Sequence, residues 1–202
     1  MALEIWHDEE WNLGTEEAGN ILPDTVRWVD IETRKVEAPA YWSLRRRWQP
    51  FMIGIAGKSD PGVAFLTVAS SESEKELIDF AAEVLEGAEI RFGATRDFDE
   101  MVLRGRFTNA RRKHSEKAGR WPNLNSLDAT WTNIRKVERP KQHERAPDCE
   151  SADVPAMWET GDFGLRKIVA LHCLRDVVEL LLADPENVLS EDLRAAFASR
   201  LA

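Results

Sequence analysis

Three strand-like segments that follow one another along the chain constrain its fold most strongly. Residues 25–31 alternate β-branched and aromatic side chains with polar ones, and residues 50–57 and 62–69 are short apolar runs. The turn sequence Lys-Ser-Asp-Pro at 58–61 separates the second segment from the third. This succession predicts an antiparallel meander of three strands.

Helix and strand signals alternate after this meander. Residues 74–86 have helical periodicity, with Ser71 or Ser73 as the N-cap and Gly87 at the end. The remaining expectations are a strand at 88–94, a helix beginning near Asp97, a short element at 127–134, loops over 138–162, and helices at 164–183 and 190–201. The order predicts an α/β fold, in which a mixed sheet made of the meander and later βα units is covered by helices.

Length and composition favour a single globular domain. The chain has 202 residues, of which 43% are hydrophobic and 31% charged, so it is long enough to bury a core. We expect residues 1–24 to form an acidic N-terminal arm and residues 25–202 to form the domain. The sequence has no apolar run of the ~20 residues that a membrane helix needs and no signal-peptide pattern at its start, which favours a cytoplasmic protein with no membrane partner. Its two cysteines indicate no disulfide framework and no zinc-binding spacing.

The charge is unevenly distributed along the chain. The net charge is −9 overall, and residues 1–24 contain seven acidic and no basic side chains. Residues 101–145 contain twelve basic and four acidic side chains, and a second basic cluster lies at 45–47. This asymmetry either indicates a polyanionic ligand or reflects ordinary solvated surface.

Four carboxylates and a histidine stand at the ends or on the faces of predicted elements. Asp30 and Glu32 share one face of a strand, because side chains alternate along it. Asp99 falls in the first turn of a helix, and His172 lies one turn before Asp176 in the longest helix. Separately, these features also fit a solvated strand end, a favourable helix dipole and a local hydrogen bond. Together they favour an oxygen-ligated Mg²⁺ or Mn²⁺ site.

Three short motifs resemble those of the DEDD 3′–5′ exonucleases, which have a ribonuclease H-like fold. Residues 29–33 (Val-Asp-Ile-Glu-Thr) resemble the first motif, residues 98–103 (Phe-Asp-Glu-Met-Val-Leu) the second, and residues 172–176 (His-Cys-Leu-Arg-Asp) the third. The segment Ser-Leu-Asp at 126–128 resembles one that these enzymes often have between the second and third motifs. The resemblance spans residues 25–183, and the predicted order of elements agrees with it.

The resemblance implies a metal-dependent exonuclease that acts on the 3′ end of single-stranded DNA or RNA and releases nucleoside monophosphates. It implies that two ions, Mg²⁺ or Mn²⁺, are held by Asp30, Glu32, Asp99 and Asp176. His172, which stands at the spacing where one branch of the family has tyrosine, would orient or deprotonate the attacking water. Nucleic acid would be contacted by Thr33, Arg34, Arg45, Arg46, Arg47, Arg111, Arg112 and Lys113. Two alternatives remain open: a non-catalytic nucleic-acid-binding or assembly protein on the same fold, and a nuclease that cuts internally.

Overall fold

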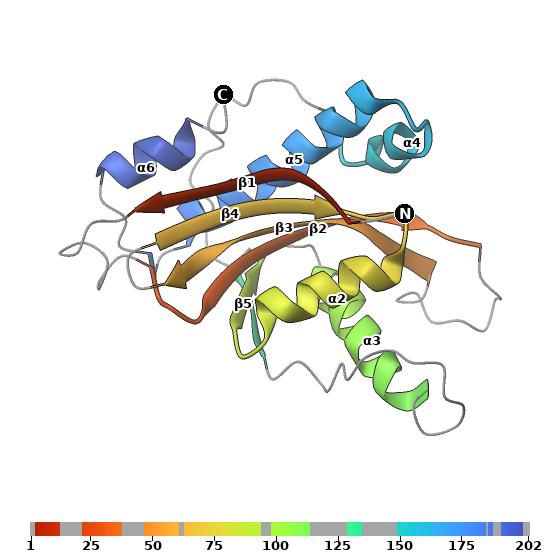
Figure 1. Cartoon of the computed structure of the whole chain (residues 1–202), viewed down its shortest axis with the longest axis horizontal. Coiled ribbons are helices and arrows are strands. Elements are labelled where there is room, and N and C mark those ends of the chain that lie inside the picture. The colour runs from red at the N-terminus through yellow and green to blue at the C-terminus, as the bar shows by residue number, and fades with distance from the viewer. Residues whose placement is uncertain are drawn as a thin grey trace.

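The computed structural model describes residues 3–12, 22–37, 47–60, 63–93, 98–113, 129–134, 149–184, 186–187 and 191–199. Within these ranges no helix is both long enough and apolar enough to cross a membrane. The described elements form one mixed sheet with helices on both of its faces (Figure 1).

Within the described part of the chain the sheet has six strands, in the spatial order β1-β4-β3-β2-β5-β6. Strands β2 (Val26–Lys35), β3 (Trp48–Asp60) and β4 (Val63–Ser70) pair antiparallel, which confirms the predicted meander. Strand β5 (Glu89–Phe92) pairs parallel with β2, and β6 (Thr130–Asn133) pairs parallel with β5. The predicted α/β class with a mixed sheet is therefore confirmed.

Helices cover the two faces of the sheet and enclose a hydrophobic core on each side. Helices α4 (Val154–Glu159), α5 (Phe163–Ala183) and α6 (Glu191–Ala198) lie on one face, and α2 (Glu74–Leu85) and α3 (Phe98–Lys113) lie on the other (Figure 1). Alternation along β2 serves both cores, because Trp28 packs on the α5 side whereas Val29 and Ile31 pack on the α2 side. Strand β2 therefore lies in the centre of the molecule.

Helices α2 and α5 begin and end where local sequence signals place their caps. The Ser73 side chain accepts a hydrogen bond from the backbone N–H of Glu76 at the start of α2, and Gly87 follows that helix with φ of 71°. Asp162 caps α5 by accepting from the N–H of Leu165 at 2.9 Å, and the helix ends before Asp184. Both helices agree with the sequence prediction to within one or two residues.

The N-terminal segment differs from the arm expected there. Residues Glu4–Asn12 form strand β1, which pairs antiparallel with β4 at the edge of the sheet. Its indole rings anchor it, because Trp6 donates a hydrogen bond to Ser70 at 2.8 Å and Trp11 packs edge-on against Phe197. Residues 13–21 lie outside the described part of the chain.

Two short elements also differ from the sequence expectations. Helix α4 lies within the stretch expected to be loop, where Pro155 occupies its first turn and the buried Trp158 ring stacks on Phe51 with centroids 4.7 Å apart. Strand β6 resolves the short element of uncertain type at 127–134. Both owe their form to packing against distant residues, which local periodicity does not report.

A buried ionic network fastens the C-terminal end of α5 to the sheet. The guanidinium group of Arg91 on β5 contacts Asp184 at 2.6 Å, Glu186 at 2.5 Å and Glu89 at 3.0 Å. Trp28 on β2 donates an indole hydrogen bond to Asp184 at 2.8 Å. Burial alone would lower the pKa of Arg91, but its hydrogen bonds to Asp184 and Glu186 raise that pKa above its usual value. The network joins α5, β2 and β5 at one end of the sheet.

Candidate metal centre

Strand β2 presents two carboxylates toward helix α5. Asp30 and Glu32 lie two residues apart and therefore point to the same face, as the sequence predicted. Glu32 is only 8% exposed, and the Oδ2 atom of Asp30 is buried with no hydrogen-bond partner among the described residues. A buried carboxylate oxygen without a donor is costly, and a cation is one means of compensation.

Helix α5 approaches this face closely because β3 has a glycine at the crossing point. Gly54 pairs with Asp30 across the β2–β3 ladder. A Cβ atom on Gly54 would lie 2.6 Å from Cγ2 of Val177 and 3.1 Å from Sγ of Cys173. The missing side chain therefore leaves the space that α5 fills directly over the two carboxylates.

Two further predicted site residues, His172 and Asp176, reach the same place from α5. Nε2 of His172 lies 3.7 Å from Oε1 of Glu32 and 3.6 Å from Oδ2 of Asp176. The same nitrogen lies 3.3 Å from the hydroxyl of Ser151, which precedes α4. The His172 side chain is almost fully buried, at 3% exposure, whereas the Asp176 side chain is 28% exposed. One turn of helix thus brings an imidazole and a carboxylate to Glu32.

The fourth carboxylate, Asp99, approaches from the first turn of α3. Its side chain is buried, and its charge acts on Asp30 together with those of Asp176 and Glu32. Burial raises the pKa of Asp30 well above its usual value, and the charges of Asp176, Glu32 and Asp99 raise it further. The other three predicted acids are therefore close enough to Asp30 for their charges to act on it. This donor set fits a divalent cation, which would offset that repulsion.

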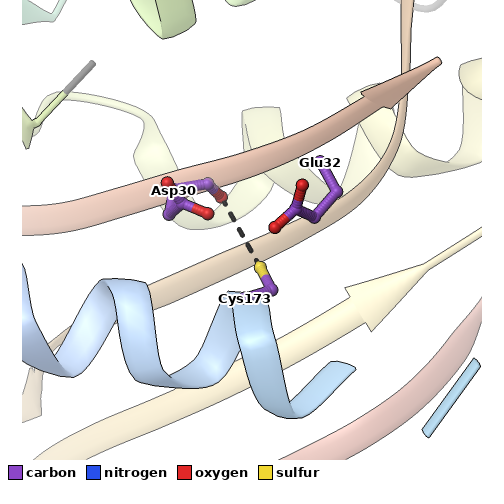
Figure 2. Close-up of side chains that lie close together, drawn as sticks. All are labelled: Asp30, Glu32 and Cys173. Atoms are coloured by element: carbon purple, nitrogen blue, oxygen red, sulfur yellow. Dashed lines mark hydrogen bonds between the residues drawn. The ribbon is translucent and has the colours of Figure 1, made fainter. Parts of the chain in front are cut away.

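Cys173 is a component of the centre that sequence reasoning missed. Its thiol is fully buried, and Sγ lies 4.0 Å from the main-chain carbonyl oxygen of Asp30 (Figure 2). Burial raises the pKa of this thiol well above its usual value, with further contributions from Asp30, Glu32 and Asp176. The motif resemblance assigns no role to Cys173, although this residue lies within the third motif. Its separation of three residues from Asp176 was the signal that the two share a helix face.

The predicted substrate-contacting residues on β2 follow directly after Glu32. Thr33 is buried, and the Arg34 guanidinium contacts Glu72 at 3.4 Å. Glu72 also forms an ion pair, at 2.5 Å, with Arg166 on α5. The guanidinium group of Arg166 lies over the ring of Trp158. The structure thus adds Glu72 and Arg166 as neighbours of Arg34 that the motifs did not indicate.

The two predicted basic clusters are described only in part. Arg47 is partly buried where β3 begins, and its carbonyl oxygen accepts a hydrogen bond from the N–H of Val36 at 2.8 Å. Arg45 and Arg46 lie outside the described residues. Residues 111–113 occupy the last turn of α3, but their side chains are outside the described part of the structure. Neither cluster is therefore placed relative to the carboxylates, and both stay predictions, as does the Asp-containing segment at 126–128.

Comparisons of the chain with protein-family models, with curated proteins and with solved structures found no match. What the chain does must therefore be argued from its own geometry.

Proposed function

We propose that this protein is a metal-dependent 3′–5′ exonuclease of the DEDD type, with a ribonuclease H-like fold, that acts on single-stranded nucleic acid. The observation on which the proposal depends is that Glu32 shares one cluster of donor atoms with Asp30 and another with His172 and Asp176, while the charge of Asp99 also acts on Asp30. Three antiparallel strands followed by two parallel ones, with acids on the central strand β2, also agree with the fold that the motif resemblance implies.

In this proposal Asp30, Glu32, Asp99 and Asp176 hold two divalent cations, Mg²⁺ or Mn²⁺. Such ions stabilise the attacking and leaving oxygens of a phosphodiester during hydrolysis. The unpartnered Oδ2 of Asp30 and the raised pKa of that carboxyl support cation binding, because both conditions are relieved by a positive charge. A module that only binds nucleic acid gains nothing from such a cluster, since its charge repels phosphate.

The proposed role of His172 is to position or deprotonate the attacking water. The distances from its Nε2 atom to Glu32 and Asp176 support this role, because a water near those carboxylates is within reach of the same nitrogen. Arg34, two residues after Glu32, and Arg166 on α5 both contact Glu72, and we propose that they contact the substrate phosphates.

The test is incubation of end-labelled single-stranded DNA and RNA with and without Mn²⁺, followed by sizing of the products. We expect stepwise shortening from the 3′ end that EDTA abolishes and that Asp30→Asn removes. Asp79→Asn is the matched control, because Asp79 lies on α2, pairs with Lys75, and should leave activity intact. Full activity in EDTA would refute the two-metal proposal. Binding without cleavage would support the non-catalytic alternative, and internal cuts would support an endonuclease.

A further inference from the structure

A sulfur atom lies among the oxygen ligands of the candidate metal centre. One carboxylate oxygen from Asp30, one from Glu32 and Sγ of Cys173 all lie within 4.8 Å of one another. Figure 2 shows the thiol on α5 pointing toward the two carboxylate side chains on β2. A second trio of donor atoms, from Glu32, His172 and Asp176, shares Glu32 with the first and meets the same 4.8 Å limit.

This donor set differs chemically from one made only of oxygens. Mg²⁺ prefers oxygen ligands in near-ideal octahedral geometry and retains several waters. Thiolate and imidazole, in contrast, favour Zn²⁺ and related ions, with metal–sulfur distances of about 2.3 Å and metal–oxygen distances of about 2.0–2.2 Å. Two ligand atoms of such an ion are separated by about 3.5 Å. The donor atoms here lie within 4.8 Å of one another, so side-chain shifts of about 1 Å or less would bring them to that separation.

Without an ion, the buried Oδ2 atom of Asp30 has no hydrogen-bond partner among the described residues, and the Cys173 thiol has only weak interactions with Asp30 itself. The thiol of Cys173 is reduced and buried, and its contact with the Asp30 carbonyl at 4.0 Å is at the limit for a sulfur hydrogen bond. Gly54 further leaves room for the sulfur over the sheet, since a Cβ atom there would lie 3.1 Å from it.

We propose that the centre binds a thiophilic divalent cation of the Zn²⁺ class through Cys173, Asp30 and Glu32, with His172 as an adjacent donor. When the ion binds, the sulfur–metal bond replaces the S–H bond and the thiol proton passes to solvent. This site takes a different class of ion from the hard-cation site proposed above, although the two overlap at Asp30 and Glu32. Occupancy by Zn²⁺ therefore excludes Mg²⁺ and inhibits hydrolysis, and this last consequence rests on the proposed function.

The direct test uses Co²⁺ as a spectroscopic probe for Zn²⁺ on the purified, metal-free protein. We expect a thiolate-to-cobalt charge-transfer band in the near ultraviolet, and we expect the band to disappear when Zn²⁺ displaces Co²⁺. Cys173→Ala and Cys173→Ser should remove it, whereas Cys149→Ala, at the chain's other cysteine, should keep it. Zn²⁺ affinity should fall more than about 100-fold in the Cys173 variants, beyond the 10–100-fold typical of losing a residue that only supports a ligand.

The variants also require a check that they fold. The increase in melting temperature caused by Mn²⁺ should persist in Cys173→Ser, because the carboxylates remain. If both Cys173 variants fail to fold, zinc X-ray absorption of the intact protein replaces them, because a sulfur ligand at about 2.3 Å is distinguishable from oxygen ligands at about 2.0–2.2 Å. Absence of the band in the unmodified protein, its persistence without Cys173, or a zinc spectrum with no sulfur ligand would each overturn the proposal.

Inhibition is measured separately, so that failure of either proposal can be recognised. Zn²⁺ added to the Mg²⁺-supported reaction should stop cleavage by the unmodified protein and should inhibit Cys173→Ser at least 10-fold less strongly. If no cleavage occurs under any condition but the cobalt band appears, the nuclease proposal fails and the thiophilic site stands. Cleavage that Zn²⁺ inhibits equally in both proteins contradicts the role of Cys173.

Discussion

Substituting Gly54 by alanine tests whether the close approach of α5 positions the metal ligands. The new methyl group would lie 2.6 Å from Cγ2 of Val177 and 3.1 Å from Sγ of Cys173. Carbon atoms in contact are separated by about 3.5–4.0 Å, so α5 must move outward by about 1 Å. A metal site tolerates deviations of only about 0.2 Å in its ligand distances. Gly54→Ala should therefore impair metal binding more than it impairs folding.

The expected size of each effect follows from these distances. Overpacking of this kind costs about 1–3 kcal/mol, which corresponds to a fall in melting temperature of about 2–12 °C for a chain of this size. At a Mn²⁺ concentration of about 100 times the dissociation constant, bound metal contributes about 2.7 kcal/mol, and a tenfold weaker site reduces this to about 1.4 kcal/mol. The Mn²⁺-induced rise in melting temperature should thus fall by about half.

The assay is thermal unfolding with and without Mn²⁺, and Gly57→Ala is its matched control on the same strand. A Cβ atom on Gly57 would meet Cδ of Arg27 at 2.6 Å, but that atom belongs to a flexible side chain that can move. This control should lose less than about 1 kcal/mol and keep the full response to Mn²⁺. If Gly54→Ala also keeps the full response, the separation between α5 and the sheet does not determine ligand placement.

Four further predictions follow from the site and its surroundings. In the metal-free protein, the free energy of unfolding should fall as pH rises from about 3.9 toward the raised pKa of Asp30. The reason is that the native state retains a proton on Asp30 that the unfolded state releases. Urea unfolding at several pH values should show a smaller fall for Asp30→Asn. Arg91→Met leaves Asp184 buried without its cation and should cost about 3–5 kcal/mol in urea unfolding, whereas loss of the exposed Arg104 pair should cost less than about 1 kcal/mol. His172→Ala should slow hydrolysis by about 10²–10⁴-fold with metal affinity nearly unchanged, and His172→Tyr should recover part of the loss; near-normal turnover would mean that another group positions the water. Neutralising residues 111–113 should weaken nucleic-acid binding and flatten its salt dependence, and an unchanged salt slope would make them ordinary surface.

The sequence predicted those parts of the centre that depend on one element at a time. Alternation placed Asp30 and Glu32 on one strand face, and helical spacing placed His172 one turn from Asp176. That these groups meet depends on the crossing of α5 over β3, which Gly54 allows and which no local pattern reports. Their meeting was expected from the joint occurrence of these residue types and from the motif resemblance, not from any one element.

The parts that the sequence did not predict are those decided by distant packing. Strand β1 is rich in acidic residues, which are depleted in strands, yet backbone pairing with β4 and the burial of its indole rings stabilise it. Cys173 has the spacing of a site residue and the chemistry of a core residue, and only its position over β2 distinguishes the two roles.

The Arg91–Asp184 network fixes the C-terminal end of α5, whereas the contact between Arg166 and Glu72, near its other end, is only partly buried. Asp184 is fixed against β2 and β5, and Asp176 lies eight residues before it, about 12 Å along the helix axis. A tilt of about 5° about this pivot would displace Asp176 by about 1 Å and Arg166, at more than twice the distance, by over 2 Å. A small change at the Arg91–Asp184 network that leaves it folded would thus produce a larger displacement of the metal ligands on α5. Metal affinity therefore depends on a network that contacts no metal ligand.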